Sequence, residues 1–201
     1  LFDAGMDPEA HALRLLVDAL GADLGAVSDI FLTHGHYDHV AAAMRCPGAR
    51  IHIGAADADV LAHRTVSRAL IPRLFGKLLS VPAVEASHRL VGRLDIDVGN
   101  GESVLAMPLP GHTPGSYAYL FDGVLFTGDA LFVGAGGLEL SGPDEAALDA
   151  STCRSIAQIS ELFREHRVSE ICTGHRGCTP PEEASIVLER LTLAPGFRCA
   201  G

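Results

Sequence analysis

The sequence predicts an α/β fold in which helices cover the outer faces of two packed β-sheets. Three observations support this prediction: strand and helix patterns alternate in the first part of the chain, strands alone fill the middle, and the alternation returns after Pro143. The 201 residues suit a single domain over residues 1–201, and no repeat or low-complexity linker divides them.

The first part begins with a strand end at residues 1–3 and a turn at Gly5. Pro8–Leu20 is predicted as a helix, with Leu13, Leu16, Val17 and Leu20 on one face and Gly21 as its stop. The elements that follow are a strand at residues 28–33, a short Ala-rich helix at 39–45, a strand at 50–53 and a helix at 55–63.

Residues 60–84 contain no acidic residue. Arg64, Arg68, Arg73 and Lys77 recur there at steps of four or five, with leucines between them, which indicates a basic amphipathic helix or helix pair. Three interpretations stay open: an ordinary solvated face, a lid in which Arg68 and Lys77 bind an anionic or acyl substrate, and a subunit interface of a homodimer.

The middle of the chain is predicted to hold strands, and the last part to be α/β again. Asp122-Gly123 is typical of a tight hairpin turn. Residues 143–166 contain a long helix with Ile156, Ile159, Leu162 and Phe163 at helical spacing. The other predicted elements are strands at 94–98, 103–108, 116–121, 124–127 and 168–172, and a closing helix at 182–193.

Histidines and carboxylates gather after the predicted strands. Thr33–His39 follows the apolar run Ile30–Leu32, and later candidates follow other apolar runs, so each lies at a strand end, where open α/β sheets place their sites. The candidate metal ligands are His34, His36, Asp38, His39, His112, Asp129 and His175. Cys172 is a further candidate, although a small buried residue ending a strand is the favoured interpretation.

Five imidazoles and two carboxylates are more donors than one catalytic zinc ion needs, since such an ion uses three protein ligands and a water. Seven donors fit two divalent metal ions about 3.5–4 Å apart with one carboxylate between them. Nitrogen and oxygen donors without thiolate favour Zn²⁺, with iron or manganese as alternatives.

The motifs H-x-H-x-D-H (34–39), G-H-T-P-G-S (111–116), G-D-A (128–130) and G-H (174–175), in this order, resemble those of the metallo-β-lactamase superfamily. The resemblance implies a four-layer αβ/βα sandwich of two mixed β-sheets flanked by helices, with N-terminal strands missing from this chain. Its implied ligand sets are His34, His36 and His112 for one metal, Asp38, His39 and His175 for the other, and Asp129 as the bridge. Asp3 resembles the family's early D-x-G segment and would lie behind the ligands.

The expected chemistry is hydrolysis by a hydroxide held between the two metal ions. Asp38 and Asp129 are the expected catalytic carboxylates, because they would fix the second metal and the water and relay a proton. Tyr37 is a weaker candidate for contact with the substrate, and packing between ligands explains it equally well.

Phe126–Phe132 and the loop around His112 resemble the hydroxyacylglutathione hydrolase (glyoxalase II) branch and its thioesterase-like relatives, which implies a small thioester or ester substrate. Val40-Ala41-Ala42 stands where that branch has glycine, and 26 residues after His175 are too few for its glutathione-gripping helical domain. Alternatives are a lactonase of the N-acyl-homoserine-lactone type, a β-lactamase-like hydrolase, and an oxidoreductase similar to persulfide dioxygenases, with one iron bound by His34, His112 and Asp129.

Composition and net charge argue against two classes of binding partner, nucleic acid and membranes. A net charge of −10 and a pI near 5.4 argue against nucleic acid, and no apolar run approaches the roughly 20 residues of a membrane span.

Five cysteines, an odd number without a C-x-x-C pair, predict reduced thiols and a cytoplasmic location. The histidines outside the motifs are expected to be structural or at the surface: His11, His52, His63, His88 and His166.

Overall fold

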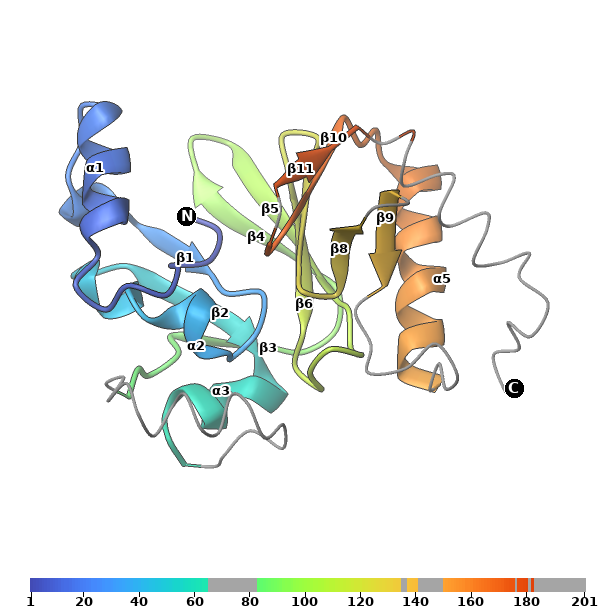
Figure 1. Cartoon of the computed structure of the whole chain (residues 1–201), viewed down its shortest axis with the longest axis horizontal. Helices are drawn as coiled ribbons and strands as arrows, with labels where there is room; N and C mark the ends of the chain where they lie inside the picture. Colours follow the sequence, from blue (N-terminus) through green and yellow to red (C-terminus); the bar gives the residue numbers. More distant parts are fainter. Residues whose placement is uncertain (65–82, 135–136, 141–149, 176, 181, 183–201) are drawn as a thin grey trace.

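The computed structural model describes residues 1–64, 83–134, 137–140, 150–175, 177–180 and 182. Its elements form four layers, which Figure 1 shows from left to right. Helices α1 (His11–Ala19), α2 (Tyr37–Val40) and α3 (Ala55–Leu61) cover one sheet, and α5 (Ala150–Glu165) covers the other. The predicted αβ/βα sandwich is confirmed.

Among the described residues, the first sheet has three parallel strands, and the second is a mixed sheet of six. The first runs in the order β1 (Asp29–Phe31), β2 (Arg50–Gly54), β3 (His88–Leu90). The second runs in the order β11 (Cys178–Thr179), β10 (Glu170–Thr173), β7 (Val124–Gly128), β6 (Tyr117–Phe121), β5 (Glu102–Pro108), β4 (Leu94–Gly99). A separate hairpin pairs β8 (Leu131–Gly134) with β9 (Gly137–Leu140), and 3₁₀ turns lie at Leu24–Ala26 and Ala43–Arg45.

Alternation along the strands divides the core into three clusters. Ile30 packs toward the helices of the first layer, whereas its neighbour Phe31 packs between the sheets. In the same way Val104 faces the space between the sheets and Leu105 faces α5. Because both faces of these strands are buried, they read as continuous apolar runs in the sequence.

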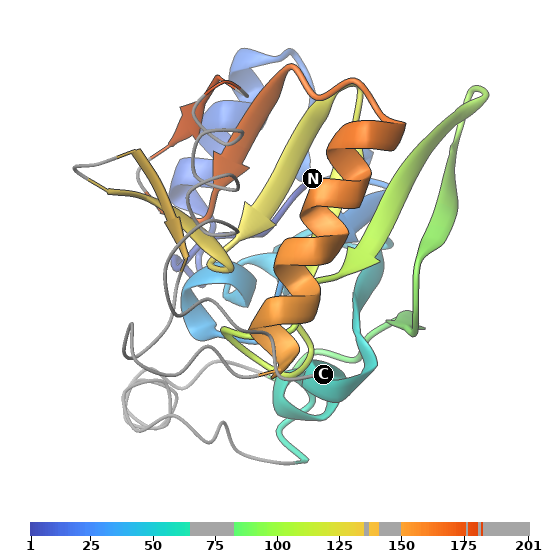
Figure 2. The ribbon, with the colours of Figure 1, turned by 90° about the vertical axis from the view of Figure 1, so that its right-hand side faces the viewer.

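Helix α5 lies along the outer face of the six-stranded sheet (Figure 2). Its Ile159 and Leu162 are almost fully buried against Leu125 and Ile171 of that sheet, as the helical spacing predicted. The hairpin turn at Asp122-Gly123 is also confirmed, since both residues have positive φ, 47° and 78°.

The N-terminal segment extends the first sheet and reaches the second. Phe2 pairs with Phe31 in a parallel bridge, and its ring stacks on Phe126 with centroids 3.9 Å apart. This anchor places Asp3 at the carboxyl end of β1.

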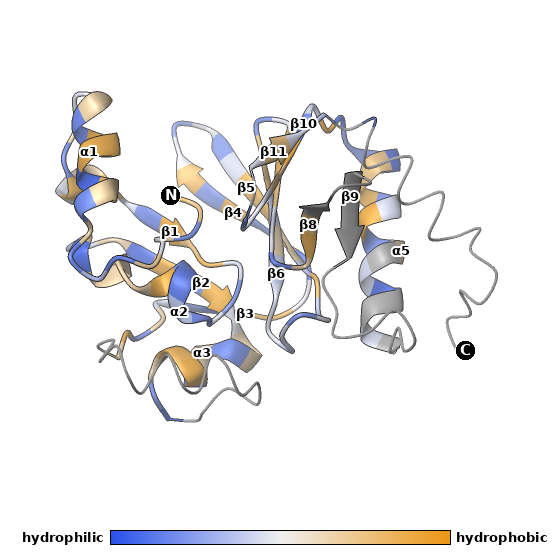
Figure 3. Cartoon of the chain, viewed as in Figure 1, coloured by the Kyte–Doolittle hydropathy of each residue, from blue (hydrophilic) through white to orange (hydrophobic). Residues whose placement is uncertain are grey.

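The prediction for the first helix was partly wrong. Helix α1 begins at His11 rather than Pro8, because the Asp7 carboxylate accepts bonds from the Glu9 and His11 backbone N–H groups and holds the preceding residues in a turn. Apolar residues lie along α1 (Figure 3), but only Val17 is buried, and Leu16 and Leu20 are 57% and 77% exposed. The predicted helix at 39–45 is likewise replaced by the short α2 and a 3₁₀ turn.

The prediction of reduced thiols was wrong for two cysteines. Cys172 and Cys178 form a disulfide between the paired strands β10 and β11, so Cys172 is neither a free metal ligand nor a simple buried apolar residue. Cys46 is free and buried. A cytoplasmic location therefore stays a prediction without support from the cysteine count.

Two sequence predictions fall outside the described residues: most of the basic segment, with Arg68 and Lys77, and nearly all of the closing helix. Within the described part of the chain, no helix combines the length and the apolar character that crossing a membrane requires.

Candidate metal centre

The seven predicted ligands meet at one edge of the two sheets. His34 and His36 follow β1, Asp38 and His39 lie on the first turn of α2, and the others follow β5, β7 and β10. Their donor atoms form two groups, each within 4.8 Å. We call His34, His36 and His112 the three-histidine cluster, and Asp38, His39, Asp129 and His175 the aspartate cluster.

In the three-histidine cluster, Nδ1 of His36 lies 3.0 Å from Nε2 of His112. His34 is 1% exposed, and the Thr33 hydroxyl lies 3.1 Å from its Nδ1. That contact fixes the ring and leaves Nε2 of His34 directed at the cluster.

In the aspartate cluster, a carboxylate behind the site orients the ring in front of it. Asp3 Oδ2 lies 2.7 Å from Nδ1 of His39 and also accepts the Thr33 hydroxyl at 2.9 Å. Nε2 of His39 then faces Asp129 Oδ1 at 3.3 Å. Nε2 of His175 lies 3.1 Å from Asp38 Oδ2.

Asp129 lies between the clusters. Its Oδ2 is 4.0 Å from Nε2 of His34 and 3.6 Å from Nε2 of His112, both in the three-histidine cluster. The same oxygen is 3.4 Å from Nε2 of His175 in the aspartate cluster. One carboxylate thus reaches both donor sets, as a bridging ligand must.

Burial and neighbouring carboxylates shift the pKa values of the clustered histidines in opposite directions. Burial lowers the pKa of His34 well below its usual value, and burial also lowers the pKa values of His36 and His112, so these rings are neutral, as metal binding needs. Burial acts downward on His39 as well, but Asp129 and Asp3 outweigh it and raise its pKa to about 10. A cation could take the place of that proton between His39 and Asp129.

Three buried donor atoms show that this arrangement fits a metal ion. Nε2 of His34, Nε2 of His39 and Oδ1 of Asp129 have no hydrogen-bond partner among the described residues. An unsatisfied buried polar atom costs about 1–3 kcal/mol. A cation in the three-histidine cluster would satisfy His34, and one in the aspartate cluster would satisfy His39 and Asp129, which face each other at 3.3 Å as an ion pair without a hydrogen bond. With nitrogen and oxygen donors only, both clusters suit zinc, iron or manganese.

The glycine before His175 is needed for close approach. A Cβ on Gly174 would lie 2.2 Å from Asp129 Oδ1 and 2.6 Å from Cε1 of His39. The G-H motif therefore reflects the passage of the backbone directly over the aspartate cluster.

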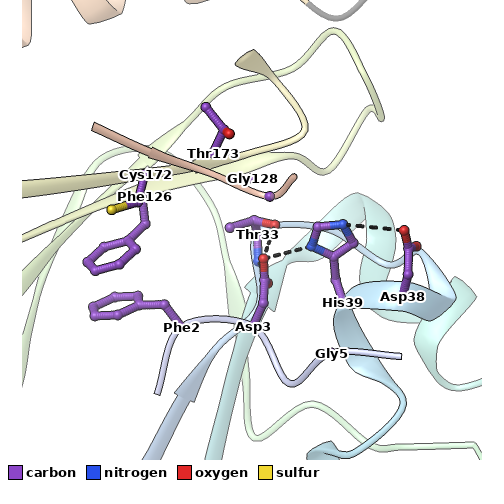
Figure 4. A pocket seen from close by; sticks show the side chains of 11 residues that line it. Phe2, Asp3, Gly5, Thr33, Asp38, His39, Phe126, Gly128, Cys172 and Thr173 are labelled. Atoms are coloured by element: carbon purple, nitrogen blue, oxygen red, sulfur yellow. Dashed lines mark hydrogen bonds and ion pairs between the residues drawn. The ribbon is translucent and has the colours of Figure 1, made fainter. Parts of the chain in front are cut away.

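A pocket opens beside the aspartate cluster, between the N-terminal segment and the ends of β7 and β10. Figure 4 shows Asp3, Asp38 and His39 on one side of this pocket and the stacked rings of Phe2 and Phe126 on the other. The His175 side chain is 55% exposed and that of Asp38 36%, against 14% for Asp129. The centre is thus reached from the side of His175 and Asp38.

Tyr37 and His52 were also singled out from the sequence, one as a substrate contact and the other as a structural histidine. Tyr37 is half-buried between His36 and Asp38, and its contact with a substrate stays a prediction. His52 is buried, bonded to Asp29 and stacked between Phe31 and His88, in keeping with a structural role. The structure adds one residue that the sequence did not single out, Asp57. Sequence analysis missed it because a single acidic residue in a helical pattern matches no motif.

Comparison with known proteins is consistent with this geometry. A family model described as "Metallo-beta-lactamase superfamily" matches residues 1–175. A hydroxyacylglutathione hydrolase of Fuscovulum blasticum is 31% identical over 173 residues, which are 84% of this chain and 54% of the relative. The chain thus spans about half the length of that relative.

Solved structures show the same fold at lower identity. A Cronobacter sakazakii metallo-beta-lactamase with a HARLDQ motif is 24% identical with a TM-score of 0.64, covering 87% of this chain and 66% of its own. A metallo-beta-lactamase family protein of Thermus thermophilus is 23% identical, also with a TM-score of 0.64, covering 95% and 71%.

Proposed function

Since this chain belongs to the metallo-β-lactamase superfamily, we propose that it is a hydrolase that cleaves a thioester or ester bond in a small-molecule substrate, using two divalent cations. The observation that carries the proposal is the convergence of seven donor side chains, with three buried donor atoms that lack partners among the described residues. The similarity to hydroxyacylglutathione hydrolases favours a thioester.

The two clusters divide the metal-binding role. The three-histidine cluster would hold one cation and the aspartate cluster the other, with the Asp129 carboxylate within reach of both, and we expect both cations to be Zn²⁺. When bound, such a pair polarises a carbonyl oxygen and lowers the pKa of a bound water toward neutrality, which is the chemistry that hydrolysis needs.

The protein's own groups orient the site and move the proton. Asp3 holds the Nδ1 proton of His39, so that only Nε2 faces the centre. The Asp38 carboxylate, on the open side of the site, accepts the proton of the attacking water and returns it to the leaving group, while Asp129 fixes the geometry. Behind the site, the buried rings of His34 and His36 close the three-histidine cluster off from bulk water.

Three residues are candidates for binding the part of the substrate away from the scissile bond. Tyr37 lies beside the ligands on α2, and Arg68 and Lys77 of the basic segment would attract an anionic acyl or thiol group. Replacing Arg68 or Lys77 with Ala should then raise KM for anionic thioesters and leave neutral ones unchanged. If the variants keep the wild-type KM for anionic thioesters, the segment is an ordinary solvated face. The cytoplasmic location and a homodimer remain predictions.

A substrate panel tests the proposal. Protein as purified, and the same protein loaded with Zn²⁺, would be assayed with thioesters, lactones, β-lactams, phosphodiesters and a persulfide, and the metal content of each sample would be measured. Turnover of thioesters or esters with two metal equivalents is the expected result. Turnover of lactones or β-lactams in preference to thioesters would reassign the substrate. One iron per chain with oxidation of a persulfide would overturn the hydrolase proposal altogether.

A further inference from the structure

Asp57 lies on the first turn of α3, outside both clusters, and is 3% exposed. Its Oδ2 accepts hydrogen bonds from the Gly35 backbone N–H at 2.9 Å and from the Thr113 hydroxyl at 2.6 Å. Its Oδ1 accepts the Gly115 backbone N–H at 2.9 Å. This buried carboxylate therefore accepts three hydrogen bonds from parts of the chain that are distant in sequence, and it holds those parts together.

The donors belong to the two loops that carry the three-histidine cluster. Gly35 stands between His34 and His36, and Thr113 directly follows His112. The Asp57 side chain therefore ties one loop to the other, next to the ligands themselves. A backbone bond from Tyr117 N–H to the Thr33 carbonyl, 2.7 Å long, joins the same loops farther along the strands.

The second loop is shaped around this carboxylate. A Cβ on Gly115 would lie 2.5 Å from both Oδ1 and the backbone N of Asp57, so only glycine fits there. The Ser116 hydroxyl accepts the Thr113 N–H at 3.0 Å and lies 2.8 Å from the Thr113 hydroxyl, which fixes the rotamer that reaches Asp57. Thr113 and Gly115 of the T-P-G-S sequence are thus explained by contact with Asp57, and Ser116 by its contact with Thr113.

We propose that Asp57 is a positioning residue that sets the distance of His112 from His34 and His36, and thereby the metal affinity of the three-histidine cluster. This inference rests on the proposed function. Three donors converge on one carboxylate, and an amide could not serve them all, because its NH₂ group would face either the Gly115 N–H or the pair of donors on Oδ2. The aspartate cluster has no hydrogen bond to Asp57 among the described contacts and should be unaffected.

The test measures Zn²⁺ affinity by competition with a chromophoric chelator, using the full chain. Asp57→Asn and Thr113→Val should each bind one of two zinc equivalents about 10–100-fold more weakly, the usual effect of losing a supporting contact. Thr113→Ser keeps the hydroxyl and should bind both equivalents as the wild type does. In a His112→Ala background, which removes a ligand of the three-histidine cluster, adding Asp57→Asn should leave the remaining equivalent unchanged.

Four outcomes would overturn the inference. Folded Asp57→Asn and Thr113→Val proteins with two wild-type zinc sites would show that the contacts do not set affinity. Equal weakening of both sites, or weakening by Thr113→Ser as well, would indicate a general structural role. If Asp57→Asn fails to fold, Thr113→Val decides, because it leaves the carboxylate in place. Wild-type protein that binds no zinc pair would remove the proposed function itself and this inference with it.

Discussion

The Asp3 carboxylate and the His39 imidazole are joined by a 2.7 Å hydrogen bond between residues 36 positions apart in the chain. The same carboxylate oxygen accepts the Thr33 hydroxyl, and Thr33 in turn contacts His34. One residue of the N-terminal segment thus supports a ligand in each cluster.

Asp3→Asn should therefore weaken Zn²⁺ binding, by roughly 10–100-fold, because the amide no longer selects the His39 tautomer. Chelator competition would measure the effect. Asp95→Asn, an exposed acid on β4, is the matched control and should bind as the wild type does. Unchanged affinity in Asp3→Asn would refute the orienting role.

Asp129→Ala should lose both metal and hydrolysis, since its carboxylate reaches histidines of both clusters. We expect both zinc equivalents to be weakened and turnover to fall by several orders of magnitude. Metal content and kcat/KM on one sample would show this. A variant that keeps two tightly bound metals and its turnover would rule out Asp129 as the bridge.

Stability should depend on pH through His52, which lies in the first sheet and away from the ligands. Burial lowers the pKa of His52 below 6.5, although its bond to Asp29 acts in the opposite direction. As the pH falls through 6.5, the unfolded chain takes up the proton before the folded chain does. The stabilising contribution is therefore complete above pH 6.5 and declines as the pH falls toward the folded pKa, by up to about 1.4 kcal/mol per pH unit.

Urea unfolding at pH 7.5 and 5.5, with chelator present, would test this expectation. The wild type should lose more stability between these two values than His52→Phe, which keeps a ring against Phe31 but cannot titrate. His166→Gln, an exposed histidine, is the control and should behave as the wild type. Equal losses in the wild type and His52→Phe would show that His52 makes no such contribution.

The Cys172–Cys178 disulfide closes a short loop that contains His175. Replacing both cysteines with serine should lower the free energy of unfolding by roughly 2 kcal/mol, by the chain-entropy account of short loops. Alkylation of the denatured, unreduced protein followed by peptide mass mapping would check the pairing. Free, alkylated thiols at both positions would contradict it.

The ligands could be predicted because each stands at a strand end in a recognisable motif, and strand ends meet at one sheet edge. Asp57 could not, since its role depends on where α3 packs, which no local pattern encodes. The exposed face of α1 was missed for a similar reason: helical spacing places Leu16 and Leu20 together but does not say which side of the helix meets the core. The disulfide depends on strand pairing between β10 and β11, which a count of cysteines cannot supply.

Metal stoichiometry tests the central claim most directly. Protein purified without chelator and loaded with Zn²⁺ would be measured by inductively coupled plasma mass spectrometry against its concentration. Two equivalents per chain are predicted, with the value falling to about one in His112→Ala. A wild-type value of one or below, unchanged in His112→Ala, would contradict a centre built from both clusters.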